Sequence, residues 1–384
     1  MARRLETAIP FDNHRSTPLA AMAPFLQGLE AANVDYLWLW DELSGWFPGD
    51  LWTERNTPAA PFIEPNSTYD PFVQAAYAAA LKPDIGLRLS TDAIRTNPAE
   101  LLRKMMSLGN ATTGKTVIAI GAGELRQTRP FGYKRSEGLA RMEDLFKLIH
   151  LLYETDGPVN FEGNHWTFKN ATLGTSRPVT RPEFWALGGG PKLLDIAAQY
   201  ADGFEMAVPQ STSTPEQFAA TVTMMRDKVE GFGRDPDNFG FGLWLLCVIH
   251  DDDQQLDRIL SNPLIKYFVG QFGRLNGDDW RAEGETSVMP EGYHYAMKWA
   301  PFDQSNEEIR RIVDAVPPSM ARKGVAAGTP AQISQLLADY REAGADFVGL
   351  LDMTGLVDGP ATAADGFRRG IEVLGDFKGV NALR

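Results

Sequence analysis

The chain has 384 residues, with 37 Lys and Arg against 50 Asp and Glu, which gives a formal net charge of −13 and a pI near 5.0. Apolar residues make up 43% and charged residues 23%, as in ordinary well-packed proteins. No basic cluster offsets the negative charge, so the composition argues against nucleic acids and anionic membranes as partners. The length allows two average domains or one large α/β barrel with insertions.

The chain contains one cysteine, Cys247, inside the apolar run 243–249. An intramolecular disulfide is therefore impossible, and a buried thiol that packs as a small apolar side chain is the simpler interpretation. No apolar stretch follows the basic residues at the N-terminus, and about 18 apolar residues never occur in a row. We expect a cytoplasmic protein without a membrane span.

Segments typical of strands and of helices alternate along almost the whole chain. The short apolar runs predict strands at 7–11, 36–40, 84–89, 115–121, 184–187, 203–207, 240–250 and 346–351. Amphipathic or capped segments predict helices at 18–32, 71–81, 98–108, 136–154, 191–200, 215–231, 330–343 and 362–374. Eight strands with intervening helices predict a parallel (β/α)8 TIM barrel of the α/β class. A doubly wound open sheet would give the same alternation and is the alternative.

Two segments, 44–70 and 262–325, fall outside this alternation and are rich in aromatic residues. Long loops in compact proteins are usually functional or disordered, and the aromatic content speaks against disorder. We expect both to be insertions in a single barrel domain of residues 1–384, where they lie at the C-terminal face and line an apolar pocket. A dimer contact or a separate small core would explain the aromatic residues equally well.

The apolar run 36–40 stops at two adjacent carboxylates, Asp41 and Glu42, and Trp46 follows shortly after. An unbroken apolar run of this length is typical of a strand that is buried on both faces. Parallel α/β folds place their chemistry at the carboxyl ends of such strands. A buried strand that ends in a solvated turn would look the same, and only the rest of the chain favours a functional site.

Two glycine-rich segments also follow predicted strands. Gly121 and Gly123 lead to Glu124 after the fourth strand, and a Gly-Gly-Gly-Pro run at 188–191 opens a predicted helix. Glycines at a helix N-terminus expose backbone N–H groups that can hold a phosphate, although glycines also simply make tight turns. The dinucleotide fingerprint GxGxxG is not met.

Other kinds of chemistry have little support in the sequence. The five histidines are scattered without an HxH or HExxH spacing, so we expect no metal site, and no GxSxG nucleophile elbow occurs. What remains is a set of acids, tryptophans and a candidate phosphate loop. This set suits a flat, phosphate-bearing redox cofactor combined with general acid/base catalysis.

In the order and spacing of these features, the chain resembles the luciferase-like superfamily of flavin and deazaflavin enzymes. Within it, the chain is most similar to the oxidoreductases that depend on coenzyme F420, such as phthiodiolone ketoreductases and F420-dependent glucose-6-phosphate dehydrogenases. The likeness covers nearly the whole chain and is best in residues 35–48, 86–98, 118–132, 186–204 and 328–351. The resemblance implies a luciferase-like TIM barrel that binds F420 and forms a homodimer.

The resemblance also implies roles for individual residues. The catalytic residues that it implies are Glu42, Glu124 and Trp46. The cofactor-binding residues that it implies are Asp41, Leu89, Ser90, Thr91, Gln127, Gly188, Gly189, Gly190 and Pro191. In this family a non-proline cis peptide backs the deazaflavin ring, and here we expect it near Arg88-Leu89.

Two residues depart from the family pattern. Glu42 occupies the position where these relatives carry a catalytic His, and a carboxylate can still act as acid or base. Gln210 lies near the position of a phosphate-binding Lys in the sugar-phosphate enzymes. A sugar phosphate is therefore not the expected substrate, and the aromatic insertions fit a larger or less polar small molecule.

The function expected from these features is F420-dependent hydride transfer to or from a carbonyl/alcohol pair, as in a ketoreductase or an alcohol dehydrogenase. An FMN-dependent luciferase-like monooxygenase on the same barrel is the first alternative. A non-catalytic cofactor-binding protein is the second, because the family His is missing.

Overall fold

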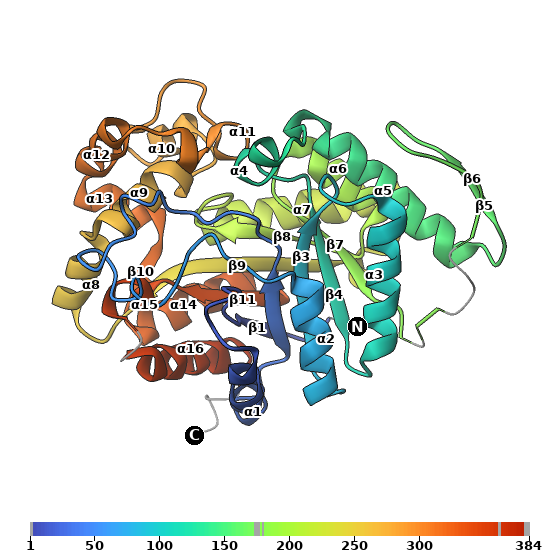
Figure 1. Cartoon of the computed structure of the whole chain (residues 1–384), viewed down its shortest axis with the longest axis horizontal. Helices are drawn as coiled ribbons and strands as arrows, with labels where there is room; N and C mark the ends of the chain where they lie inside the picture. The colour runs from blue at the N-terminus through green and yellow to red at the C-terminus, as the bar shows by residue number, and fades with distance from the viewer. Residues whose placement is uncertain (1–2, 173–176, 179, 360–361, 380–384) are drawn as a thin grey trace.

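Eight parallel strands close into a barrel in the computed structural model, which describes residues 3–172, 177–178, 180–359 and 362–379 (Figure 1). The strands are β1 (Glu6–Pro10), β2 (Tyr36–Trp40), β3 (Gly86–Asp92), β4 (Thr116–Gly121), β7 (Glu183–Leu187), β8 (Gly203–Val208), β9 (Gly240–Ile249) and β11 (Phe347–Asp352). They pair in this order, and β11 pairs with β1 to close the ring. The predicted (β/α)8 barrel is confirmed, and the closure excludes the open sheet.

Helices cover the outside of the barrel between these strands. They are α1 (Met22–Ala31), α2 (Pro71–Leu81), α3 (Pro98–Ala111), α5 (Gly138–Glu154), α6 (Pro191–Tyr200), α7 (Pro215–Gly231), α14 (Pro330–Glu342) and α16 (Ala363–Phe377). Several begin with a side-chain cap followed by proline; for example, Asp70 accepts hydrogen bonds from the N–H groups of Phe72 and Val73. Among the described residues, no helix combines the length and apolarity that crossing a membrane requires.

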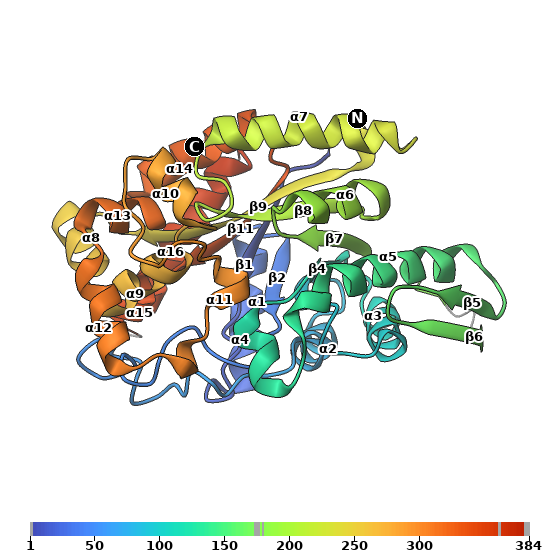
Figure 2. The ribbon, with the colours of Figure 1, turned by 90° about the horizontal axis from the view of Figure 1, so that it is seen from above.

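Two parts of the chain differ from the expected elements. Strand β3 continues past Leu89 to Asp92, because Ser90, Thr91 and Asp92 pair in register with β4. This extension keeps three polar side chains on a rigid strand at the mouth of the barrel. An antiparallel hairpin of β5 (Val159–Glu162) and β6 (Thr167–Ala171), which the sequence did not predict, projects to one side (Figures 1 and 2).

The predicted insertion 262–325 is mostly helical and follows α8 (Asp253–Leu260). Its elements are α9 (Pro263–Phe272), α10 (Gly277–Ala282), α11 (Tyr295–Lys298), η5 (Pro301–Asp303), α12 (Asn306–Ala315) and α13 (Pro318–Gly324), and β10 (Ala326–Gly328) then pairs with β9. Together with Phe47 and Leu51 from segment 44–70, these helices build a second apolar core. The two insertions therefore pack against each other beside the barrel.

Short elements complete the chain, and most of them lie around the barrel mouth. They are η1 (Leu19–Ala21), α4 (Leu125–Thr128), η2 (Arg129–Phe131), η3 (Arg135–Glu137), η4 (Pro236–Asn238) and α15 (Thr354–Asp358). Of these, α4 and η3 follow β4, and α4 lies close to α11 of the insertion (Figure 1). They bring the segment after β4 into contact with the second core.

A buried ion pair lies inside the barrel. The Nε of Arg88 donates to Glu205 at 2.9 Å, and both side chains are almost fully buried. Trp185 fills the adjacent space because Gly203 and Gly240 face it; a Cβ at Gly240 would lie 2.2 Å from the Trp185 ring. The Arg88 guanidinium stacks 4.5 Å from that ring. Side chains therefore fill the barrel interior below its mouth and form the bottom of any cavity there.

Candidate active site

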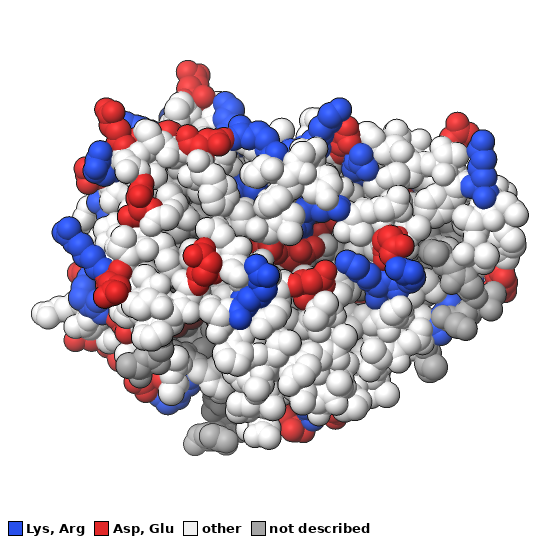
Figure 3. Space-filling view, viewed as in Figure 1, with Lys and Arg blue, Asp and Glu red and all other residues white. Residues whose placement is uncertain are grey.

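A cavity of about 560 Å³ opens at the carboxyl ends of the barrel strands. In Figure 3 acidic atoms lie at the bottom of a central hollow and basic atoms stand at its margin. The predicted site residues that line the cavity are Asp41, Glu42, Trp46, Ser90, Thr91, Glu124, Gln127, Gly188, Gly189, Gly190 and Pro191. Residues from four strand ends thus meet in one place, as TIM barrels arrange their sites. No group of three or more metal-ligating side chains occurs among the described residues.

Asp41 is fixed by two neighbours at the start of the loop after β2. The Thr91 hydroxyl donates to its Oδ2 at 2.7 Å, and the Arg95 guanidinium lies 3.0 Å from the same oxygen. Burial raises the pKa of Asp41, and the positive charge of Arg95 and the Thr91 hydrogen bond oppose that shift. Asp41 can therefore present a carboxyl group in one defined orientation.

Glu42 and Glu124 share one buried cation, Arg126. The guanidinium places Nη2 2.8 Å from Glu42 Oε1 and Nε 2.8 Å from Glu124 Oε2. The indole N–H of Trp46 also donates to Glu42 Oε1. Burial alone would lower the pKa of Arg126, but the two carboxylates outweigh burial and raise that pKa. One guanidinium therefore binds two carboxylates, and all three side chains line the cavity.

Each of these acids keeps one carboxylate oxygen without a donor among the residues that the structure describes. These oxygens are Oε2 of Glu42 and Oε1 of Glu124. The side chains of Glu42 and Glu124 are 14% and 26% exposed, whereas Arg126 is 5% exposed. The arrangement can therefore hold or accept a proton at the cavity surface while Arg126 fixes the other oxygen of each acid.

The glycine-rich loop leads from β7 into α6 at the edge of the cavity. Gly188 adopts a φ of +134°, which favours glycine, and Pro191 occupies the first turn of the helix. A Cβ at Gly189 would lie 2.6 Å from the Met206 methyl, so only glycine fits there without a shift. The first N–H groups of α6 lack intrahelical acceptors and can bind an anion.

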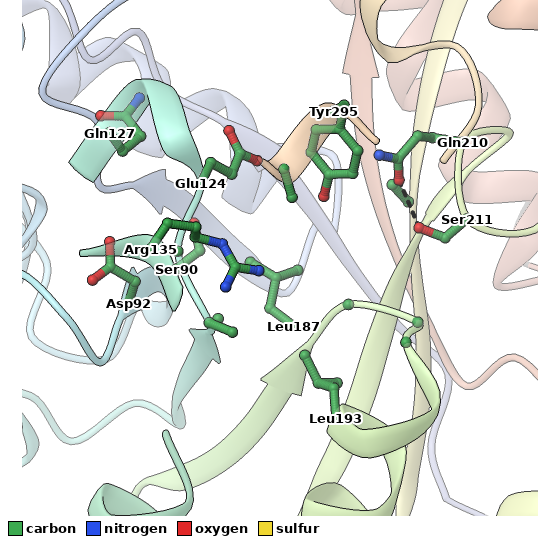
Figure 4. Close-up of a pocket in the computed structure, with 18 of the residues that line it drawn as sticks. Ser90, Asp92, Glu124, Gln127, Arg135, Leu187, Leu193, Gln210, Ser211 and Tyr295 are labelled. Atoms are coloured by element: carbon green, nitrogen blue, oxygen red, sulfur yellow. Dashed lines mark hydrogen bonds between the residues drawn. The ribbon is translucent and has the colours of Figure 1, made fainter. Parts of the chain in front are cut away.

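Arg135 adds a positive charge to this cavity. Figure 4 shows its guanidinium directed into the space between Glu124 and Leu187. Its Nε is buried and has no hydrogen-bond partner among the described residues. Burial lowers the pKa of Arg135, and the negative charge of Glu124 opposes that change. An anionic or polar ligand group would satisfy this side chain.

Tyr295, from the insertion helix α11, completes the cavity. Its hydroxyl points into the space between Glu124 and Gln210 (Figure 4). Burial raises the pKa of the phenol, and the nearby Glu124 carboxylate adds to that rise. The phenol therefore stays protonated at neutral pH and can donate a hydrogen bond to a ligand oxygen.

A family model for luciferase-like monooxygenases matches residues 5–346. The chain belongs to this family. It is 27% identical over 324 residues to a phthiodiolone/phenolphthiodiolone dimycocerosates ketoreductase of Mycobacterium sp. (strain JLS), a match that covers 82% of this chain and 83% of that protein. An F420-dependent glucose-6-phosphate dehydrogenase of Nakamurella multipartita is 29% identical over 189 residues, which are 48% of this chain and 54% of that protein. These matches confirm the resemblance and make the protein an oxidoreductase.

A solved structure supports the fold of this luciferase-like protein. An F420-dependent secondary alcohol dehydrogenase in complex with an F420-acetone adduct superposes with a TM-score of 0.72 at 16% identity. The superposition covers 98% of this chain and 99% of the other. At this identity the match establishes the shared barrel alone.

One structural expectation taken from the family is wrong. Among the described residues no cis peptide lies near Arg88-Leu89, where β3 pairs in regular parallel register with both β2 and β4. Within the described residues, the cis peptide bond is Val208-Pro209 at the end of β8. The side chain of Leu89 is fully buried in the core between barrel and helices, so only its backbone is available to the cavity side.

The side chain of Gln127 is hydrogen-bonded to the loop after β2 in this luciferase-like site. Its Oε1 accepts from the backbone N–H of Leu43 at 2.7 Å and its Nε2 donates to the Ser44 carbonyl at 2.8 Å. It thereby fixes the loop after β2 to α4. Its role as a cofactor contact stays a prediction.

Four residues that line the cavity of this luciferase-like protein were not among the site residues predicted from the sequence. They are Arg95, Arg126, Arg135 and Tyr295. Arg126 follows Glu124 by two residues, and this proximity was the available signal for it. Tyr295 had no such signal, because its position depends on how a long insertion folds back over the barrel.

Proposed function

We propose that this protein transfers a hydride between coenzyme F420 and a carbonyl or alcohol substrate. The observation that carries the proposal is the pair of acids, Glu42 and Glu124, that Arg126 holds at the cavity beside Trp46. The names of the relatives support it, since one is a ketoreductase and another an F420-dependent dehydrogenase. One structurally similar enzyme is an F420-dependent secondary alcohol dehydrogenase.

The residues of the cavity fit a cofactor with a flat ring and a phosphate. Trp40 and Trp46 offer aromatic surface, with ring centroids 6.0 Å apart, next to the polar end of β3. The N-terminus of α6 and the unpartnered Arg135 Nε suit a phosphate. When bound, the deazaflavin would supply or accept the hydride at its ring carbon.

The chain's own residues would handle the proton that accompanies the hydride. In ketone reduction, a C–H bond forms at the carbonyl carbon by hydride addition and an O–H bond forms at its oxygen, which gives a secondary alcohol. Glu124 Oε1 or Glu42 Oε2 holds that proton, and the Tyr295 phenol donates a hydrogen bond to the substrate oxygen. General acid/base help of this kind contributes roughly 10²–10⁴-fold to the rate.

The substrate side of the cavity favours a ligand less polar than a sugar phosphate. Gln210 is buried, and its Oε1 accepts a hydrogen bond from the Ser211 hydroxyl at 2.6 Å. An amide at this position supplies no charge for a phosphate group. Phe272, Ala296 and Met297 add apolar surface from the insertion. We therefore propose an uncharged ketone or secondary alcohol.

Cofactor titration followed by a turnover assay tests this proposal. We expect the protein to bind F420, to reduce ketones with the reduced deazaflavin, and to restore the visible absorption of the oxidised cofactor. The family name favours a flavin monooxygenase as the second candidate. Tight FMN binding with oxygen consumption and no affinity for F420 would overturn the proposal. Cofactor binding without turnover of any alcohol or ketone would instead indicate a carrier protein.

We also propose that the protein is a homodimer, as the resemblance to this family implies. Light scattering of the purified protein at several concentrations tests this assembly. A mass near 42.4 kDa at all concentrations would contradict it.

A further inference from the structure

A second and larger cavity, of about 830 Å³, lies beneath the insertion segment 44–70. It is bounded by the ends of β1 and β11, by α15, and by the first turns of α16. Its apolar lining includes Ile9, Phe25, Phe47, Trp52, Phe62, Ile63, Leu350, Leu351, Met353, Leu356 and Phe367. Its size falls within the range of small-molecule sites.

Several polar side chains of this second cavity are engaged with one another. Asp12 accepts hydrogen bonds from the backbone N–H of His14 and from the Thr17 hydroxyl. Asp352 accepts from the N–H of Thr354 at 2.9 Å and also from its hydroxyl. Asn13 Nδ2 and Arg369 Nε are buried and have no hydrogen-bond partner among the described residues, so they remain for a polar group of a ligand. The rest of the lining is mostly apolar, and the cavity therefore favours a largely apolar occupant.

The two cavities share a wall made of Trp40, Glu42 and Trp46, because these three residues line both. The wall is one layer of side chains thick. Trp46 stacks on Phe268 with ring centroids 5.2 Å apart, and its N–H holds Glu42. A ligand in the second cavity can therefore reach the acid that the proposed reaction uses.

We propose that the second cavity binds the hydrocarbon chain of the substrate, a ketone or secondary alcohol whose oxygen-bearing carbon lies at the Glu42–Trp46 wall. This assignment rests on the proposed function for the redox step and names the substrate class. Burying each additional methylene is worth about 0.8 kcal/mol, or roughly fourfold in affinity. Affinity should therefore rise with chain length until the cavity is full.

Gly366 offers a way to fill the cavity without disturbing the fold. It lies within α16 and lines the second cavity, and a Cβ there would meet only Asp352 Oδ2, at an ordinary 3.6 Å. Leucine is also a better helix former than glycine. Ala364 is exposed on the same helix and does not line the cavity, so Ala364→Leu is the matched control.

Calorimetric titration of the full-length protein, without cofactor, with a series of unbranched 2-alkanones tests the assignment. We expect affinity to rise about fourfold per methylene in the wild type and in Ala364→Leu, and Gly366→Leu to weaken the longest ketones at least tenfold. Gly355→Leu at the rim, where a Cβ meets no atom within 4 Å, provides a second filling variant.

The outcomes separate this inference from the proposed function. Affinity that does not depend on chain length, or filling variants that bind like Ala364→Leu, would overturn the cavity assignment even if F420-dependent turnover of short ketones occurs. Chain-length-dependent binding that Gly366→Leu weakens would support the assignment even if no turnover with F420 is found.

Discussion

Two buried Arg–Glu groups lie at different depths of the same barrel. Inside, Arg88 pairs with Glu205, one cation with one anion, and both side chains are at most 1% exposed. At the mouth, Arg126 pairs with both Glu42 and Glu124, and these acids remain partly exposed to a cavity. The residue types are the same, but the stoichiometry and the exposure differ.

The difference indicates what each group does. A pair with balanced charge that is at most 1% exposed, with only Glu205 at the floor of the cavity, fixes the packing of the barrel interior. A cation shared by two acids leaves excess negative charge and free carboxylate oxygens at the cavity surface. We infer that the inner pair, Arg88 and Glu205, stabilises the fold. The outer group, Arg126 with Glu42 and Glu124, takes part in the chemistry.

The largest expected effect is on turnover, at the outer group. Glu124→Gln should lower kcat by about 10²–10⁴ because the amide cannot exchange a proton, and Glu42→Gln should act in the same direction. Cofactor binding and thermal stability should change little. Steady-state kinetics with F420 and a ketone measure this, with Glu143→Gln, a partly exposed acid on α5 outside the cavity, as the control. Wild-type turnover in both active-site variants would remove the acid/base assignment.

The next effect is on stability, at the inner pair. Glu205→Ala leaves the Arg88 charge buried without its partner, which costs about 3–5 kcal/mol of the free energy of unfolding. Glu143→Ala breaks a partly exposed pair with Lys147 on one helix and should cost less than about 1 kcal/mol. Urea denaturation of both variants gives the comparison. Equal losses would mean that the inner pair has no special structural role.

The sequence predicted the outer group only in part, for a physical reason. Glu42 and Glu124 each follow an apolar strand, and strand ends are visible in the pattern of residues. Arg126 and Glu42 are 84 residues apart in the sequence. Glu42 follows β2 and Arg126 follows β4, and β3 lies between these two strands in the barrel. Such a contact depends on the tilt of α4, and no local pattern encodes that tilt.

The barrel itself was predictable because its signals are local. All eight expected strands overlap observed ones, since each is a short apolar run followed by a turn or a capped helix. The errors occur where tertiary pairing overrides the local pattern, as in the extension of β3 through Ser90 and Thr91. The second cavity could not be predicted either, since it forms between segment 44–70 and the distant segments 350–359 and 362–370.

A smaller effect is expected at the hydrogen bond that orients the outer group. Trp46→Phe keeps the stacking on Phe268 but removes the N–H that donates to Glu42. A hydrogen bond to a charged group is worth about 1.5–3 kcal/mol, and Arg126 still holds the same oxygen, so kcat should fall about tenfold. Steady-state kinetics at saturating ketone measure the change. A loss as large as that of Glu42→Gln would mean that Trp46 does more than orient the acid.

The smallest effect concerns another buried acid, Asp346, at the opposite end of the barrel. Burial raises its pKa to about 7, although Arg3 lies 3.6 Å away and the Phe241 N–H donates to it. The folded state therefore keeps a proton that the unfolded chain releases near pH 4, and this contribution to stability is lost as the pH rises from about 4 to about 7. Asp346→Asn keeps an acceptor oxygen but cannot ionise.

The Asp346→Asn variant should therefore gain stability relative to the wild type across that pH range. The slope for one proton is at most about 1.4 kcal/mol per pH unit, and screening around the partly exposed Arg3 reduces the total to about 1 kcal/mol. Denaturant unfolding of both proteins at pH 4.5, 6 and 7.5 measures the difference. A constant difference would show that Asp346 stays charged in the fold, so that Arg3 and Asp346 form a balanced pair like Arg88 and Glu205.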